Sequence, residues 1–405
     1  MIIKRFILSL GLVAAATSLT GVSLAASADQ PSLLPGMHSN AESQLLAALG
    51  QAQNGDYDNA LSDLSNLISE KPNFKLAQLV YGELMVARAG HGLTPTLDNK
   101  LTNQRNALLD EAKSRWAHRL AASTNGEVPA SIVQLAPEYN HVIVADLTSN
   151  RVYLFKNESG VPHLVGDYYS TIGRGGAGKQ REGDMRTPVG IYHITRYMTD
   201  AQLPELYGIG ALPLDYPNIY DESLGRTGHG IWLHGVPRET YSRTPRDSEG
   251  CVVLSNDDFE TLRDSAKPGI TPVVLTRSIQ WVSLAEAEKR RQTMLARLGA
   301  WQQSWESINT GQYLAYYSPD FVDDDGMNKQ QFADYKQRIN AGKTHIDVDL
   351  SQVSIFNYPG NPRLMQITFN QQYTSNNYSG DSRKVQYWKQ NDQGEWQILL
   401  SRDNS

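Results

Sequence analysis

Hydrophobic residues recur at helical spacing between residues 42 and 89. Leucine, isoleucine, valine and alanine occupy every third or fourth position in three successive runs, with polar residues between them. This period is typical of amphipathic helices that bury one face against their neighbours. The same pattern predicts a further helix from Gln104 to Leu120, which ends before the polar run Ser123-Thr124-Asn125-Gly126. We therefore expect an N-terminal helical domain over residues 29–125.

The turn inside this domain has the features of a known repeat. Gly55-Asp56-Tyr57 with Ala60, followed by Pro72, resembles one tetratricopeptide-type unit. A single unit cannot bury both of its faces, and the sequence holds no clear second copy. We interpret the segment as a helical hairpin docked on the next domain and not as a peptide-binding array.

After Pro137 the hydrophobic period changes from helical spacing to two. Alternating and continuous apolar runs, separated by Gly and Pro, are typical of short strands. The expected strands cover residues 141–146, 151–155, 168–172, 191–194, 230–234 and 271–275. A mostly β, sandwich- or barrel-like domain is therefore predicted over residues 137–278.

The last part of the chain begins with a charged amphipathic helix over residues 284–308, in which Trp301 and Trp305 lie four residues apart. Four strand-rich segments follow, at residues 346–356, 363–374, 384–390 and 396–401. Long helices followed by antiparallel strands predict a separate α+β domain over residues 284–405. The fold class is thus multidomain: helical, then mostly β, then α+β.

The first 28 residues have the features of a secretory signal. Lys4 and Arg5 precede an apolar stretch that runs from Phe6 to Ala16, and Ala26-Ser27-Ala28 offers a small-residue cleavage site. We expect cleavage near Ala28, a periplasmic mature protein and no membrane span after cleavage. The formal charge of −6 over 405 residues argues against a nucleic-acid partner, which would require a basic face.

The only cysteine, Cys251, is the strongest candidate for chemistry. A lone thiol in an exported protein cannot form an internal disulfide, and thiols become nucleophiles as thiolates. His234, seventeen positions upstream, is a candidate base, and Gly250 permits a sharp turn whose N–H, with that of Cys251, faces a developing oxyanion. The alternative is a buried structural cysteine near an unrelated core histidine.

A family resemblance adds to this interpretation. His234-Gly235, followed by Ser248-Glu249-Gly250-Cys251 and then Asn256, resembles the catalytic signature of L,D-transpeptidases of the YkuD type, and the match covers roughly residues 139–277. The C-terminal segment resembles a SnoaL-like (nuclear-transport-factor-like) cone. The pairing of the two domains resembles exported L,D-carboxypeptidases that trim peptidoglycan stem peptides.

The resemblance implies a mechanism without a metal or an organic cofactor. Cys251 attacks the carbonyl before a terminal D-amino acid, typically that of diaminopimelate in a tetrapeptide stem. His234 accepts the thiol proton, and the Gly235 carbonyl orients the imidazole ring. D-alanine leaves, and a thioester remains. An amine acceptor completes transpeptidation, whereas water completes hydrolysis.

Two residues depart from the family pattern. Glu249 stands where most members have a second histidine, and Val253 where an arginine is common. A carboxylate near a thiol raises the pKa of that thiol, so Glu249 bears on the acidity of Cys251. Arg243 and Arg246 are candidates for the missing positive charge, with ordinary loop solvation as the alternative.

The remaining candidates for substrate contacts are Ser248, Glu249, Asn256 and His229. For His229 the strand alternation favours a structural role, although membership of the site stays open. The expected partners are peptidoglycan stem peptides, together with cell-wall or envelope proteins that contact the helical domain.

Three functions remain in competition at this level. Transfer to an amine is the primary interpretation, and hydrolysis of tetrapeptide to tripeptide is the alternative. A non-catalytic cell-wall binding module, with a degenerate central domain, is the rival from another class. A papain-like protease is disfavoured because its histidine follows the cysteine, whereas His234 precedes Cys251.

Overall fold

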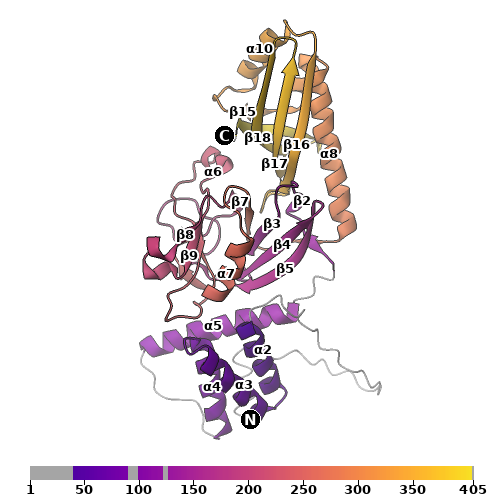
Figure 1. Ribbon diagram of the computed structural model, residues 1–405. Helices are drawn as coiled ribbons and strands as arrows, with labels where there is room; N and C mark the ends of the chain where they lie inside the picture. The colour runs from indigo at the N-terminus through magenta and orange to yellow at the C-terminus, as the bar shows by residue number, and fades with distance from the viewer. Residues whose placement is uncertain (1–39, 90–98, 122–125, 404–405) are drawn as a thin grey trace, which may run out of the picture.

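The computed structural model describes residues 40–89, 99–121 and 126–403, and the predicted export signal lies outside these ranges. The described chain forms a helical domain, a mostly β domain and an α+β domain, stacked one on the next (Figure 1). The predicted multidomain fold class is confirmed. In the described ranges, no helix has the length and apolar character needed to cross a membrane.

In the described ranges, the helical domain has four helices around one apolar core. Leu45, Leu49, Leu64 and Val80 are fully or almost fully buried in it. Asp56 caps the second helix, because its side chain accepts a hydrogen bond from the Asn59 N–H. The helices are α2 (Asn40–Gln53), α3 (Tyr57–Glu70), α4 (Lys75–Arg88) and α5 (Asn99–Ala121).

The central domain contains two principal sheets that face each other across an apolar core. The larger sheet has the order β5-β4-β3-β13-β7 and the smaller one the order β12-β10-β9-β8. The larger sheet is built from β3 (His141–Asp146), β4 (Arg151–Glu158), β5 (Val161–Tyr169), β7 (Gly190–His193) and β13 (Pro272–Thr276). The smaller is built from β8 (Met198–Thr199), β9 (Gly210–Pro213), β10 (Trp232–His234) and β12 (Val252–Val253).

Short elements complete the central domain. Two further strands pair in parallel at the edge of the site described below. They and the short helices are β6 (Ile172–Gly173), β11 (Arg246–Ser248), η1 (Asp200–Gln202), η2 (Glu205–Tyr207), α6 (Ile219–Ser223) and α7 (Asn256–Ser265).

The C-terminal domain is a curved six-stranded sheet with a long helix along it (Figure 1). Its core is aromatic, and Trp301, Trp388 and Tyr317 are fully or almost fully buried in it. Its helices are α8 (Leu284–Glu306), α9 (Thr310–Leu314) and α10 (Lys329–Asn340). Its strands are β15 (Tyr317–Val322), β16 (Ile346–Asn357), β17 (Leu364–Ser375), β18 (Tyr378–Gln390) and β19 (Trp396–Asp403).

The segment before the central domain also belongs to the C-terminal one. β2 (Ile132–Gln134) adds the sixth strand to that sheet by pairing with β16. β1 (Val128–Pro129) pairs with β14 (Trp281–Val282), so both ends of the central domain lie together. The chain thus enters and leaves the central domain at one place, which joins the two domains firmly.

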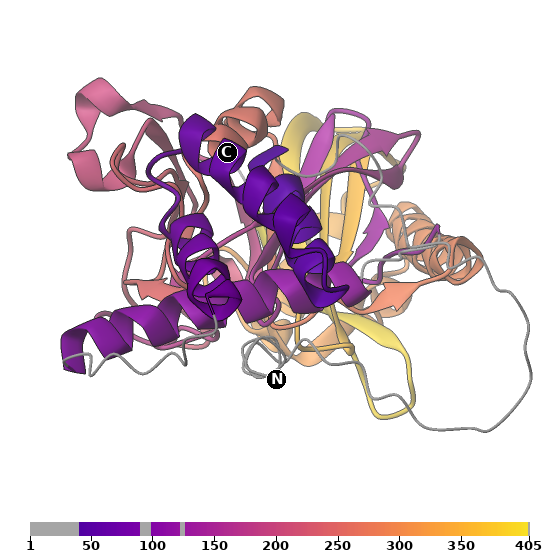
Figure 2. The same ribbon diagram turned by 90° about the horizontal axis from the view of Figure 1, so that it is seen from below.

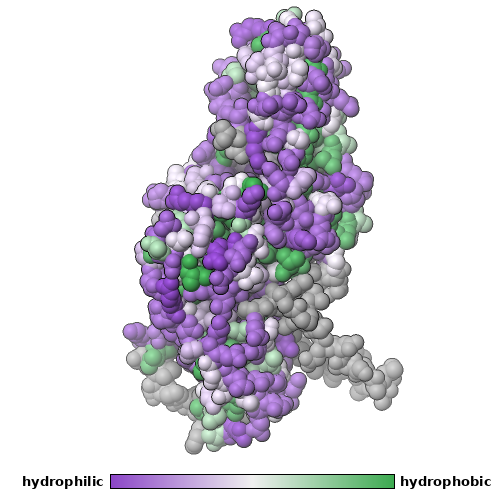
Figure 3. Space-filling model, in the orientation of Figure 1, coloured by the Kyte–Doolittle hydropathy of each residue, from purple (hydrophilic) through white to green (hydrophobic). Residues whose placement is uncertain are grey.

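Both outer domains pack against the central domain. On one side, Tyr220 of α6 stacks on Tyr387 of β18, with ring centroids 5.3 Å apart. On the other side, the four N-terminal helices cover one end of the central domain (Figure 2). The face shown in Figure 3 is mostly hydrophilic and carries only small, separate hydrophobic patches.

Candidate active site

The register of two short strands places the predicted base on one strand and the predicted nucleophile directly before the neighbouring strand. β10 and β12 run parallel, with Leu233 opposite Val252 and His234 opposite Val253. Leu233 and Val252 point into the apolar core. Because side chains alternate along a strand, His234 points to the other face of the sheet. Cys251 directly precedes β12 at the level of Trp232, so thiol and imidazole share this region.

His234 is held in one tautomer. Its Nδ1–H donates a hydrogen bond of 2.6 Å to the Gly235 carbonyl, which leaves Nε2 as the proton acceptor. The side chain is 3 % exposed, and this burial lowers the pKa of His234 to about 4. At neutral pH the imidazole is therefore uncharged and able to act as a base.

The Cys251 thiol is a weak acid in its resting state. Its surroundings are largely buried, and this burial raises the pKa of Cys251 to about 11. The Trp232 backbone N–H and the positive charge of Arg243 act in the opposite direction, and the Glu249 carboxylate raises the pKa further. The thiol points to the Gly230 carbonyl at 3.5 Å. A neutral thiol beside a neutral imidazole requires proton transfer to Nε2 as the sulfur attacks.

The turn before Cys251 is fixed from within. The Ser248 hydroxyl donates to the Cys251 carbonyl at 2.6 Å and accepts a hydrogen bond from the Gly250 N–H at 3.2 Å. Gly250 has φ +133°, and a Cβ there would lie 2.8 Å from the Arg186 carbonyl oxygen. The Gly250 N–H, which was expected to face an oxyanion, is thus occupied by Ser248. Among the described residues, none accepts a hydrogen bond from the Cys251 N–H.

Tyr207 covers the catalytic pair and was not found in the sequence. Its ring lies 4.9 Å from that of His234 and 4.8 Å from that of Trp232. Burial raises the pKa of Tyr207, and the charges of Cys251 and Glu249 raise it further. The tyrosine belongs to a short helix far from either motif in sequence, so no local pattern points to it.

Arg243 supplies the positive charge of the site. Its Nε donates to the Asp247 carboxylate at 2.9 Å, and its side chain is only 15 % exposed. This charge acts on both Cys251 and His234. Glu249 is exposed, and its charge acts on Cys251, two residues along the chain. Its carboxylate is suited to an ammonium group of a ligand.

Asn256 organises the backbone around the base. Its Oδ1 accepts hydrogen bonds from the N–H groups of Val236 at 3.0 Å and Ile209 at 3.4 Å. The Asn256 side chain, which was expected to contact substrate, is therefore hydrogen-bonded to the backbone of Val236 and Ile209.

Two further predicted residues lie apart from these contacts. His229 and Arg246 are exposed, and their side chains make no polar contact within the described part of the chain. A role for either in substrate binding stays a prediction.

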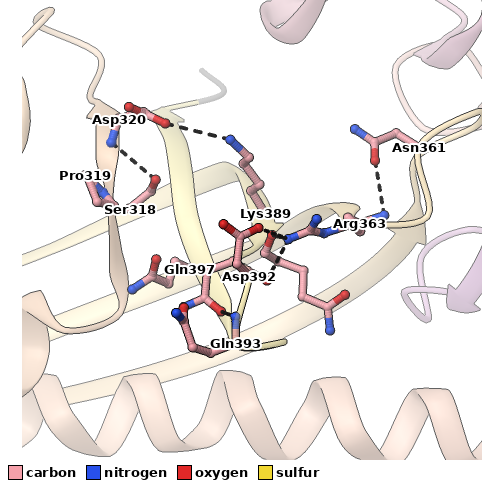
Figure 4. A pocket seen from close by; sticks show the side chains of 11 residues that line it. Ser318, Pro319, Asp320, Asn361, Arg363, Lys389, Asp392, Gln393 and Gln397 are labelled. Atoms are coloured by element: carbon pink, nitrogen blue, oxygen red, sulfur yellow. Dashed lines mark hydrogen bonds and ion pairs between the residues drawn. The ribbon is translucent and has the colours of Figure 1, made fainter.

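A hollow lies in the C-terminal domain. It has a volume of about 620 Å³ and a polar lining that includes Arg363, Lys389, Asp320 and Asp392 (Figure 4). The cations are already paired: Arg363 with Asp392 at 3.1 Å, and Lys389 with Asp320 at 3.7 Å. No residue of the central domain lines this hollow.

Comparison with known families agrees with this geometry. Residues 140–275 match the family model of the L,D-transpeptidase catalytic domain (YkuD), and residues 293–402 match that of the Cds6 C-terminal NTF2-like domain. The predicted pairing of a YkuD-type catalytic domain with a nuclear-transport-factor-like domain is confirmed. No curated protein matches the sequence.

Two solved structures share this architecture over most of the chain. Bd1075 of Bdellovibrio bacteriovorus is 27 % identical, covers 69 % of this chain and 99 % of its own, and has a TM-score of 0.61. The helical cell shape determining protein Pgp2 from Campylobacter jejuni is 25 % identical, covers 67 % of this chain and 95 % of its own, and has a TM-score of 0.58. The central domain is thus similar to the L,D-transpeptidase catalytic domain, and the chain shares its architecture with a helical cell shape determining protein.

Proposed function

We propose that this chain is an exported cysteine enzyme that acts on peptidoglycan stem tetrapeptides in the periplasm. The observation that carries the proposal is the pairing of Cys251, on a fixed turn, with a buried His234 whose Nε2 is left as an acceptor. The match of residues 140–275 to the L,D-transpeptidase domain supports the substrate class.

The reaction follows from the protonation states. The Cys251 sulfur attacks the carbonyl of diaminopimelate while its proton passes to His234 Nε2. The imidazolium then protonates the leaving amine, D-alanine departs, and a thioester joins the peptide to Cys251. The positive charge of Arg243 favours the developing anion at the sulfur and the carbonyl oxygen.

The second half of the reaction is transfer to an amine. The exposed Glu249 carboxylate beside Cys251 attracts an ammonium group, which is the resting form of an amine acceptor. The ammonium group first loses one proton to solvent, which gives the free amine. Neutral His234 then removes a second proton from the nitrogen as it attacks the thioester carbonyl, and the imidazolium returns this proton to the Cys251 sulfur as the C–S bond breaks.

Hydrolysis of the same thioester is the second candidate. The observation that favours it is the nuclear-transport-factor-like domain attached to the catalytic domain. With water as acceptor the tetrapeptide becomes a tripeptide, and the enzyme is an L,D-carboxypeptidase.

Incubation of the purified protein with a disaccharide-tetrapeptide tests both candidates. Dimers linked between two diaminopimelate residues indicate transfer, and tripeptide alone indicates hydrolysis. The Cys251→Ala variant must give neither product. A wild-type protein that releases no D-alanine, but whose Cys251→Ala variant binds cell wall as well as the wild type, would instead favour the non-catalytic binding module.

A further inference from the structure

The loop that joins the base to the nucleophile is held by the helical domain. Tyr241, in the middle of this loop, is 4 % exposed and belongs to the apolar core of the helices. Its ring lies 4.2 Å from that of Phe74, which is completely buried at the start of α4. A residue of the catalytic domain thus completes the core of another domain.

Polar contacts fix the same stretch of loop. The Tyr241 N–H donates to the Asn73 carbonyl at 3.2 Å, and the Asn73 side chain donates to the Arg238 carbonyl at 3.0 Å. The Ser242 hydroxyl donates to the Glu111 carboxylate of α5 at 2.7 Å. These four contacts therefore tie the loop to the start of α4 and to α5, and α5 lies along this end of the central domain (Figure 1).

The helical side of these contacts is rigid. Glu111 is fully buried and forms an ion pair with Arg115 at 2.9 Å, and Arg115 reaches Glu42 of α2 at 2.8 Å. The Arg115 guanidinium also lies 3.9 Å from the centre of the Tyr169 ring of β5. Because a buried charge is costly to separate from its partner, this network favours one placement of the helices on the catalytic domain.

The residue after Ser242 is Arg243, the cation of the site. Its carbonyl accepts hydrogen bonds from Tyr169 Oη at 3.1 Å and Thr171 Oγ1 at 2.9 Å. Its guanidinium is directed to Asp247, within reach of the catalytic pair. A shift of the preceding two residues would be passed to Arg243, because Tyr241, Ser242 and Arg243 are consecutive in the chain.

We propose that the helical domain acts as a clamp that positions Arg243 beside Cys251 and His234 by holding Tyr241 and Ser242. Ser242, in the loop of the catalytic domain, and Phe74, in a helical domain that neither family model includes, are then positioning residues for the thiol. The inference rests on the proposed function for the reaction itself, but its effect on the thiol is measurable without substrate.

The test compares the reactivity of Cys251 in variants of the full chain. The charged or titratable groups that act on this thiol are Arg243, Lys179, Glu249 and Tyr207, and His234 lies on the neighbouring strand. The rate of alkylation by iodoacetamide is measured against pH for the wild type, Ser242→Ala and Phe74→Ala. Displacement of Arg243 should slow alkylation at pH 8 by about tenfold and move the profile to higher pH, since one pKa unit corresponds to a tenfold change in thiolate. Arg243→Gln should shift it in the same direction.

Conservative variants and a matched control separate positioning from folding. Ser242→Thr keeps the hydroxyl and Phe74→Leu keeps most of the apolar volume, so both should restore the wild-type profile. Arg105→Ala breaks an ion pair with Glu83 inside the helical domain and should leave the profile unchanged. If Ser242→Ala and Phe74→Ala remain folded by circular dichroism and alkylate on the wild-type profile, the clamp is wrong.

Turnover of disaccharide-tetrapeptide distinguishes this proposal from the proposed function. With an active wild type, the clamp predicts a lower kcat in Ser242→Ala and a KM within about twofold of the wild type, because the thiol and not the ligand contacts has moved. A wild type without turnover, whose alkylation profile still shifts in the variants, would overturn the proposed function and support the clamp. A lower kcat with an unshifted profile would overturn the clamp alone.

Discussion

The side-chain oxygen of Asn256 accepts a hydrogen bond of 3.0 Å from the backbone N–H of Val236, two residues after the base His234. The same oxygen excludes a side chain at position 235, where a Cβ would lie 2.2 Å from it. The Gly235 carbonyl in turn accepts the hydrogen bond that orients the imidazole. Asn256 therefore positions the His234 imidazole indirectly, through the backbone of residues 235 and 236.

Gly235→Ala should lower kcat by at least about tenfold, because the added methyl group must displace Asn256 or the backbone that holds the ring of His234. Asn256→Ala should act in the same direction, since it leaves the Val236 N–H without its acceptor, at a cost of about 1–3 kcal/mol. Release of D-alanine under saturating substrate measures kcat. Unchanged kcat in both variants would contradict this role for Asn256.

The buried base predicts how activity and stability depend on pH. The pKa of His234 in the folded protein is about 4, below its ordinary value of 6.5. Activity should therefore persist down to about pH 5 and disappear as the pH falls through 4, where the imidazole takes up a proton. A loss of activity centred near pH 6.5, in rates measured with intact protein, would show that the base is not buried as described.

The free energy of unfolding should also depend on the protonation of His234. Below pH 6.5 the unfolded chain binds a proton at His234 before the folded chain does, so the free energy of unfolding falls as the pH falls from 6.5 to about 4. The His234 contribution to this loss is up to about 3 kcal/mol. Chemical denaturation at pH 7 and pH 4.5 should show a smaller difference for His234→Gln than for the wild type.

The sequence could predict those parts of the site whose backbone conformation is determined by neighbouring residues in the chain. The strand at residues 141–146 has the predicted bounds, because apolar alternation stops at a polar turn on one side. His234 lies at the end of β10, and Cys251 directly precedes the neighbouring strand β12. Each belongs to a short motif whose glycines and strand period define its local backbone. Ser248 and Gly250 belong to the turn before Cys251, so the same local pattern predicts them.

The contacts made across the fold could not be predicted. Tyr207 reaches His234 through two strands and a short helix, and nothing within its own segment marks it. The helix predicted to begin at Gln104 begins at Asn99, since polar residues there give no apolar period. Tyr241 looks like an ordinary loop aromatic, and only the docked helices show that it completes their core. β2 likewise joins a sheet more than two hundred residues away in sequence.

The buried ion pairs between the helical and central domains predict a large effect of one substitution. Arg151 is completely buried and bonds Glu42 of α2 at 2.8 Å and Asp167 of β5 at 2.7 Å. Arg151→Met leaves both carboxylates without this partner and should lower the free energy of unfolding by about 3–5 kcal/mol. Urea denaturation measures this free energy of unfolding.

The exposed pair Arg290 and Glu286 is the control, and Arg290→Ala should change stability by less than about 0.5 kcal/mol. A small effect for Arg151→Met would contradict a tightly docked helical domain.

A buried carboxyl on α7 predicts that the folded protein loses stability as the pH rises toward neutral. Asp258 is 5 % exposed, and this burial raises the pKa of its carboxyl to about 7, although the Ser255 hydroxyl donates to it at 2.7 Å. As the pH rises from the ordinary value of 3.8 to about 7, the unfolded chain releases this proton first, so the folded state loses stability with rising pH.

Asp258→Asn keeps an acceptor for Ser255 and carries no charge. It should be more stable than the wild type by about 1–4 kcal/mol at pH 8, with an advantage that shrinks toward pH 4. Glu260→Gln, an exposed change on the same helix, should show no such trend. A constant difference between Asp258→Asn and the wild type across this range, measured by urea denaturation, would mean that Asp258 is ionised in the folded protein.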